Sequence, residues 1–320
     1  MPLLNEADLK RHNSAIAGGL KLIDIQSFID TAINKHIIPL IGFAQLTELE
    51  QAKADPSPAQ QRVIDLLQKA AVGFMVYYWA DQGALEMNST GIQVRKGPNV
   101  APASDKKILA LKKQNIAIGF DSLELATAVM EASAADFPIY LASSEREENT
   151  RLLMNSSAEF QAAGVHIDND ARLYRRLRTY QGEVEEKYIL RVMGDDIRDA
   201  LHQAMLSGTM SEVQKKLLSH VRKAIAFYTM AECIPYMAVS IDSTGIFQLN
   251  ETVGGISGNV ENRSSASDKL LASAMHQFIT KAEEKLEMVR KFLIRNKQEF
   301  SYTAPETVAI NEPGSNVYFF

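Results

Sequence analysis

Few residues of this sequence have the types and spacing that catalysis or metal binding requires. None of the six histidines pairs at i, i+4 beside a glutamate, and Cys233 is the single cysteine, so a zinc site has little support. Gly194-Asp195-Asp196 resembles the acidic triplet of a polymerase or metal-dependent nuclease. The matching place earlier in the chain is Gly42-Phe43-Ala44, which favours a helix stop and restart, with the acids capping the next helix.

Other candidate motifs also have structural explanations. Ser104 to Lys107 fits Ser-x-x-Lys, but a matching later segment ends in Leu270, so helix capping explains the serine. Gly254–Asn259 lacks both the dinucleotide fingerprint and the Gly-Lys-Ser/Thr of a phosphate loop, which leaves a mobile loop favoured over a ligand cradle. Cys233 and His220 fall within an apolar helical pattern and are predicted core residues. We therefore expect no catalytic residue, metal site or cofactor.

Basic side chains are the best candidates for binding a partner. They are the cluster Arg172, Arg175, Arg176 and Arg178, and the pair Arg95 and Lys96 after a predicted hairpin. The first three arginines share a helix face, and the matching stretch near 20–26 has only Lys21, so the fold does not need this charge. A solvated or internally paired face, an interface with an acidic partner subunit, and contact with nucleic-acid phosphates all remain open.

Composition narrows the function classes further. The chain has 320 residues, of which 46% are apolar and 23% charged, so it can form a core, and its length favours two domains. A net charge of −5 argues against a free, electrostatically driven nucleic-acid binder. The longest apolar run, 70–80, is too short to span a bilayer, and the charged start lacks the pattern of a signal peptide. We expect a soluble protein made in the cytoplasm.

An internal repeat organises the chain. Blocks recur in the same order at shifts that only grow, which indicates a tandem duplication. The matched blocks are 35–49 with 187–201, 89–92 with 243–246, and 103–106 with 266–269, at shifts of 152, 154 and 163.

Each copy has the same predicted elements. A first helix ends at a glycine, near 23–41 and 170–193, and a short second helix follows, near 43–54 and 195–206. A third helix carries an apolar stripe, which is Val63, Leu67, Ala70, Ala71 and Phe74 in copy one and Leu217, Val221, Ala224, Ile225 and Tyr228 in copy two. The run Tyr77-Tyr78-Trp79 is predicted core, NSTG and DSTG each predict a hairpin turn, and Gly119 is a candidate bend in the following helix.

The predicted fold class is mainly α, with two tandem copies of a helical-bundle unit. Residues 1–137 form the first repeat with a projecting β-hairpin near 84–96, and 138–157 form a linker. Residues 158–302 form the second repeat with a hairpin near 237–249, and 303–320 form an extended C-terminal tail. The tail is polar but ends in Val317, Tyr318, Phe319 and Phe320, which we expect to bind a partner.

The order IIPLIG, a short helix, LLQKAAVGFMVYYWA and NSTGIQV resembles an uncharacterised family of helical proteins encoded in the virion-assembly modules of tailed phages and prophages. Copy two departs from that pattern, with Arg191 in place of the proline and Tyr228 alone where copy one has a tyrosine pair. A function at those residues would therefore remain only in copy one. The family carries no assigned activity, but its arrangement is similar to that of head–tail connectors, which are not enzymes.

The resemblance implies a set of partners and a place in the virion. A connector would form a homo-oligomeric ring, for example a dodecamer, bind the portal protein above and a tail or neck protein below, and lie at the head–tail junction. DNA would pass through its channel without sequence-specific binding, and no membrane would be involved. The alternatives are a non-viral helical scaffolding protein that binds through its tail, and an enzyme of unknown type.

Overall fold

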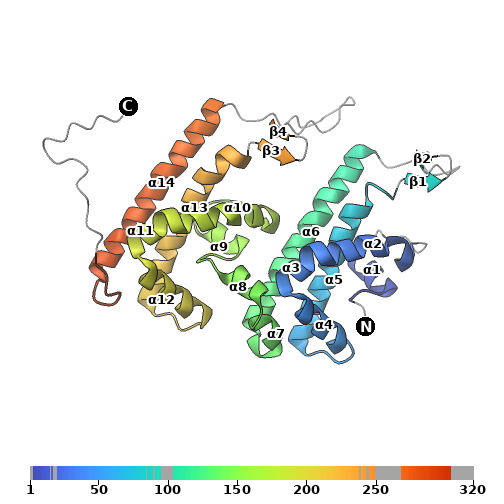
Figure 1. Cartoon of the computed structure of the whole chain (residues 1–320), viewed down its shortest axis with the longest axis horizontal. Coiled ribbons are helices and arrows are strands. Elements are labelled where there is room, and N and C mark those ends of the chain that lie inside the picture. Colours follow the sequence, from blue (N-terminus) through green and yellow to red (C-terminus); the bar gives the residue numbers. More distant parts are fainter. Residues whose placement is uncertain are drawn as a thin grey trace. The chain divides into compact units, whose positions relative to one another are not determined.

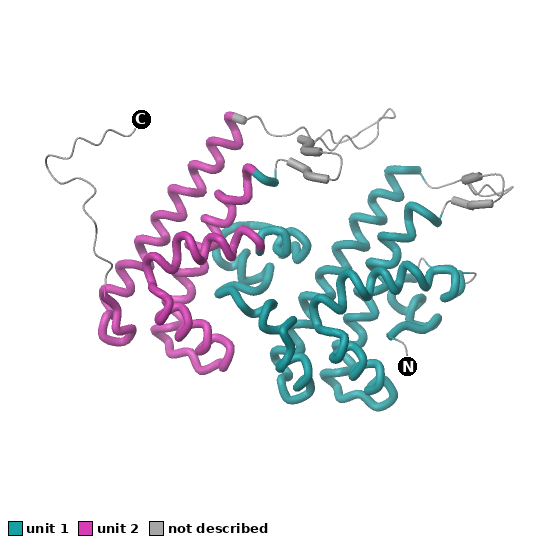
Figure 2. Tube along the Cα trace, in the orientation of Figure 1, with its two compact units in different colours: residues 1–178, 236–267 teal, residues 179–235, 268–320 magenta. Residues whose placement is uncertain are grey.

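The chain is mainly α-helical in the computed structural model, which describes residues 3–14, 16, 20–83, 85–88, 91–94, 104–237, 239–242, 245–248 and 268–303 (Figure 1). It divides into two compact units. Unit 1 contains residues 1–178 and 236–267, and unit 2 contains 179–235 and 268–320 (Figure 2). Among the helices of the described part, none combines the length and hydropathy that a membrane span needs.

The helices follow the two predicted copies. Those before residue 171 are α1 (Glu6–His12), α2 (Leu22–Ala32), α3 (Ile38–Ile41), α4 (Phe43–Ala52), α5 (Pro58–Trp79), α6 (Asp105–Ala132), α7 (Pro138–Leu141), α8 (Ser144–Thr150) and α9 (Ser157–Ala162). The later ones are α10 (Ala171–Val184), α11 (Leu190–Met193), α12 (Asp195–Leu206), α13 (Glu212–Met237) and α14 (Asp268–Arg295). Two π-helical turns, Ile33–Ile37 and Glu185–Ile189, precede α3 and α11, and a 3₁₀ turn, Ala134–Asp136, precedes α7.

Two short pairs of strands interrupt the helices. β1 (Leu85–Asn88) pairs antiparallel with β2 (Gly91–Val94), and β3 (Val239–Asp242) pairs antiparallel with β4 (Gly245–Gln248). The hairpins predicted near 84–96 and 237–249 fall at these places. Their turn residues, 89–90 and 243–244, lie outside the described residues.

The same order of elements appears in both copies. Each π-helical turn leads into a one-turn helix that ends at a glycine with positive φ, Gly42 at 81° and Gly194 at 76°. Glycine adopts this conformation without the steric cost that a Cβ adds. Pro39 follows the first π-helical turn and Arg191 follows the second, so the turn does not depend on the proline.

The apolar stripe of the third helix is confirmed as the core. All five stripe residues of α5 are fully buried, and in α13 all five are buried as well. Ser57 starts α5 with a capping box to Gln60, and Pro58 occupies the first helical turn, where its missing N–H is not needed. The Tyr77-Tyr78-Trp79 run was predicted as core but is only partly buried, because it lies at the end of α5 against the edge of the cluster.

Gly119 serves close packing rather than the predicted bend. Helix α6 is continuous through it. A Cβ on Gly119 would come within 2.6 Å of the Phe74 ring, and one on Gly73 would come within 2.7 Å of the Asn115 carbonyl oxygen. These two glycines therefore allow α5 and α6 to approach each other more closely than larger residues would.

The stretch 138–157, predicted as a linker, contains two helices and belongs to unit 1. It forms α7 and α8 and the first residue of α9. Tyr140 in α7 is almost fully buried, and the boundary between the units falls after Arg178, inside α10. The charged run at 145–149 suggested a solvated connection, but Arg146 and Asn149 in this run bind Glu131 and the Leu40 carbonyl oxygen of unit 1.

Two predicted caps differ in detail. Ser104 is the N-cap residue of α6, but its side chain makes no capping hydrogen bond. Gly194, rather than an acid, is the N-cap of α12. Asp195 and Asp196 are in the first turn, where their negative charge interacts favourably with the positive end of the helix dipole.

Candidate functional site

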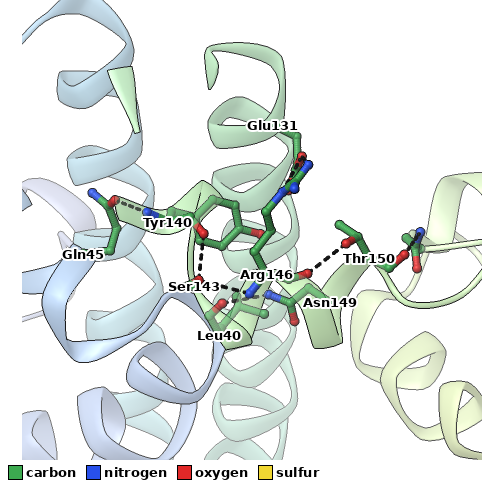
Figure 3. A network of polar contacts seen from close by, with 9 residues as sticks. Leu40, Gln45, Glu131, Tyr140, Ser143, Arg146, Asn149 and Thr150 are labelled. Atoms are coloured by element: carbon green, nitrogen blue, oxygen red, sulfur yellow. Dashed lines mark hydrogen bonds and ion pairs between the residues drawn. The ribbon is translucent and has the colours of Figure 1, made fainter. Parts of the chain in front are cut away.

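Helix α8 covers the corner between α3 and α4 in unit 1 (Figure 3). Asn149 Nδ2 donates to the Leu40 carbonyl oxygen at 2.7 Å, and the Tyr140 N–H donates to Gln45 Oε1 at 2.9 Å. Ser143 caps α8, since its Oγ accepts from the Arg146 N–H at 3.1 Å. We call this set of contacts the corner network; it satisfies backbone groups that the end of α3 and the start of α8 would otherwise leave without partners.

An ion pair completes the corner network. The Arg146 guanidinium binds the Glu131 carboxylate of α6 in a bidentate manner, with two distances of 2.9 Å. This pairing is the largest cause of the raised pKa of Arg146. Burial raises the pKa of Tyr140 to about 12, so its phenol stays protonated and available as a donor. The network therefore holds α6, α7 and α8 together.

A second polar cluster lies at the first π-helical turn, and we call it the first clasp: His36, Phe74, Tyr78 and Phe120. The His36 ring stacks on Phe74 at 4.0 Å between centroids, and Phe120 meets it edge-on at 5.5 Å. His36 Nε2 hydrogen-bonds the Tyr78 hydroxyl at 2.8 Å. Burial, helped by Lys35 and Arg175, lowers the pKa of His36 to about 4, so the imidazole is neutral at physiological pH.

The same positions of unit 2 carry a second clasp: Lys187, Tyr188, Tyr228 and Glu232. Tyr188 stacks on Tyr228 at 3.9 Å and donates its hydroxyl proton to Glu232 Oε1 at 2.6 Å. Lys187 Nζ donates to the same oxygen at 2.7 Å. These two hydrogen bonds lower the pKa of Glu232, and burial raises the pKa of Tyr228 to about 12.

The clasps tie the first helix of each copy to its third helix. Their members correspond at the repeat shifts, since His36 matches Tyr188, Phe74 matches Tyr228 and Tyr78 matches Glu232. π-Helical turns are rare and often mark functional or strained positions. The sequence analysis did not predict either clasp. A signal was present, because the repeat aligns His36 with Tyr188 and Tyr78 with Glu232, so a polar side chain occurs at both positions in both copies.

The predicted arginine cluster does not act as one surface. Arg172 and Arg176 are exposed. Arg175 is half-buried, with its guanidinium carbon 5.6 Å from the centre of the Phe120 ring. Arg178 donates to Asn155 Oδ1 at 3.3 Å and to the Glu148 carbonyl oxygen. Two of the four arginines are thus engaged within unit 1, and two face solvent.

Carboxylates of α6 explain why α9 and α10 pack where they do. The Glu124 carboxylate accepts the Ser157 N–H at 3.1 Å and the Ser157 Oγ–H at 2.6 Å. Asp121 accepts the Ala171 N–H at the start of α10. Burial raises the pKa of both carboxylates, Asp121 and the half-buried Glu124. Arg175 provides a positive charge beside Glu124 that partly offsets this burial.

The other predicted residues are placed as follows. Cys233 is fully buried, and its thiol donates to the Met230 carbonyl oxygen at 3.3 Å. His220, predicted as core, is half-buried; burial lowers its pKa, and its Nδ1 lacks a hydrogen-bond partner within the described residues. Predicted residues that lie outside the described part are Arg95, Lys96, Gly254–Asn259, Val317, Tyr318, Phe319 and Phe320.

Within the part of the chain that the structure covers, no three His, Cys, Asp or Glu side chains gather in a way that could hold a metal ion. Asp195 and Asp196 are exposed in the first turn of α12. The polar clusters that do form are hydrogen-bonded joints between helices, so their evident chemistry is packing and orientation.

The fold and these joints define a mainly helical protein with two similar sets of elements. The chain belongs to DUF6712, a family of unknown function, whose model matches residues 37–150 and 189–310. The matches begin at Ile37 and Ile189, the last residues of the two π-helical turns, and the first ends with α8 at Thr150. Comparisons with curated proteins and with solved structures give no match.

Proposed function

We propose that this chain is a structural virion protein, a head–tail connector (adaptor) subunit that forms a ring beneath the portal and links the capsid to the tail. The observation that supports it best is the duplicated helical unit, in which the prominent polar clusters join one helix to another. Such clusters stabilise an arrangement of helices, as a building block requires, and no catalytic residue or cofactor is part of the proposal.

Exposed side chains supply candidate surfaces for neighbouring subunits. Unit 1 exposes large apolar residues on three helices, with Ile23 at 79%, Phe43 at 69% and Leu125 at 53% exposure. Arg172 and Arg176 add positive charge on α10. A cyclic ring joins two different faces of each subunit, so apolar and charged surfaces of this kind suit it. Val317–Phe320 and the hairpin-flanking Arg95 and Lys96 are proposed as further contacts with the portal, tail or neck protein.

Native mass spectrometry of the full chain, alone and mixed with a tailed-phage portal protein, tests the proposal. We expect a closed oligomer of identical subunits, or its formation when the portal is added. Replacing both Arg172 and Arg176 by Glu should weaken assembly, whereas the same change at the exposed Lys216 of α13 is the matched control. A chain that stays monomeric in every mixture would contradict the connector role and leave a scaffolding protein of another system as the better explanation.

A further inference from the structure

The imidazole of His36 packs among side chains of two long helices of unit 1. Phe74 of α5 stacks on it at 4.0 Å between ring centroids, and Phe120 of α6 meets it edge-on at 5.5 Å. The Tyr78 hydroxyl of α5 hydrogen-bonds its Nε2 at 2.8 Å. The π-helical turn that carries His36 is thus joined to α5 and α6 through one titratable ring.

The charges that act on this ring are cationic. Lys35 lies 5.6 Å from the centre of the Tyr78 ring, and Arg175 of α10 lies 5.6 Å from the centre of the Phe120 ring. Burial lowers the pKa of His36 most, and Lys35 and Arg175 lower it further, to about 4. Among the described residues, no carboxylate forms an ion pair with His36. A charged imidazole at this place would therefore be partly buried beside two cations and without a counter-ion.

The joint itself does not need a histidine. Tyr188 takes the place of His36 in copy two, where it stacks on Tyr228 and donates to Glu232. Burial raises the pKa of Tyr188, so its ring stays uncharged from neutral to acid pH. The histidine of copy one therefore adds a response to pH that the repeated helices do not require.

We propose that His36 is an acid-sensitive lock, and that protonation of its ring loosens the π-helical turn from α5 and α6 and the start of α10 from α6. The hydrogen bond to Tyr78 is not what is lost, because the phenol oxygen can accept from an imidazolium as well. The cost comes from placing a second positive charge beside the Phe120 ring, which Arg175 already contacts. This lock is independent of the connector role.

The direction of the effect follows from the folded and unfolded pKa values. The folded pKa of His36, about 4, lies below the ordinary value of 6.5, so its contribution to stability is complete above pH 6.5 and is lost as the pH falls towards 4. This shift corresponds to an opening equilibrium about 20-fold larger at pH 5 than at pH 7, and solvent screening of a partly exposed ring lowers the expectation to about 5- to 20-fold. Glu124 and Asp121 of α6 act in the opposite direction, because burial raises their pKa values.

Amide hydrogen exchange of the full chain at pH 7 and pH 5 tests the lock, with each rate divided by the intrinsic rate at the same pH. Protection of amides 37–42 and 175–178 should fall about 5- to 20-fold in the wild-type chain. His36→Phe keeps an aromatic ring that does not titrate, and it should remove most of this fall. Changing the exposed His276 of α14 to Gln is the matched control and should leave the fall unchanged. No fall in the wild type, or an equal fall in His36→Phe, would overturn the proposal.

A proton NMR titration of the wild-type chain is a second test that does not depend on how a variant folds. The Cε1 proton of His36 should change its chemical shift below pH 5, whereas a midpoint near 6.5 would overturn the proposal. Unit 2 is not used as the control, because burial also lowers the pKa of its His220.

Discussion

Tyr78 and Glu232 occupy the same repeat position, and each anchors a clasp with different chemistry. Tyr78 meets a neutral histidine, whereas Glu232 meets a lysine and a tyrosine. The shared feature is a hydrogen bond from the third helix to the π-helical turn of the first. The bond is therefore what both copies keep, while the partners differ.

Tyr78→Phe should remove the bond of the first clasp and keep the ring. We expect unfolding free energy to fall by about 0.5–1.5 kcal/mol, the usual net worth of such a bond. Tyr77→Phe is the matched control, since the Tyr77 ring contacts Lys112 and Tyr78 without a described hydroxyl bond to lose. Urea unfolding of the three proteins measures the effect, and equal losses in both variants would refute the clasp as a stabilising joint.

Glu232→Gln should make the second clasp insensitive to acid. The pKa of Glu232 is lowered by its bonds to Lys187 and Tyr188, so its contribution to stability is present above the unfolded pKa near 4.5 and is lost as pH falls through the folded value. The stability gap between wild type and variant should therefore be largest at neutral pH and close in acid. A gap that widens as the pH falls would mean that the carboxylate is not held in its charged form.

The helical spacing of apolar residues predicted the core stripe, because this periodicity can be read from a short stretch of sequence. They did not predict the clasps, whose members are about 40 residues apart in each copy, with 42 residues from His36 to Tyr78 and 44 from Tyr188 to Glu232. The arginine cluster was found, but its division into exposed and engaged members depends on Phe120 and Asn155, which only the fold brings close.

At the scale of elements, α5 and α6 depend on two glycines for their close contact. Gly119→Ala would place a Cβ against the Phe74 ring and should lower unfolding free energy by about 1–3 kcal/mol, the typical cost of overpacking. The exposed Gln114→Ala on the same helix is the control and should change it by less than about 0.5 kcal/mol. Chemical denaturation measures both, and a neutral Gly119→Ala would show that the helices can separate without cost.

The packing of α10 on α6 depends more on Arg175 than on the next residue, Arg176. Arg175→Ala loses the contact with the Phe120 ring and removes the positive charge that Arg175 provides beside Glu124, so we expect a loss of about 1–3 kcal/mol. Arg176→Ala changes an exposed side chain and is the matched control. Thermal and urea unfolding measure both variants. Equal small effects would show that Arg175 does not stabilise the packing of α10 on α6.

Element boundaries were predicted well where glycine and helix caps marked them, as at Gly42 and Gly194. The segment 138–157 was misassigned because its charge run suggested solvent. Its burial depends on Gln45, Leu40 and Glu131, which lie far away in the sequence. Local pattern cannot reveal such partners.

At the scale of the whole molecule, duplication is what joins the observations. One family model matches in two segments, the same elements recur, and both copies carry a π-helical turn with a clasp. A protein built this way presents related helical surfaces twice in one chain. That property supports the proposed role of holding neighbouring subunits rather than transforming a substrate.

Negative-stain electron microscopy of the full chain mixed with a tailed-phage portal protein tests this role most directly. We predict closed rings of this chain seated coaxially on the portal. Isolated single-chain particles of 35.5 kDa beside undecorated portals, at every mixing ratio, would contradict it.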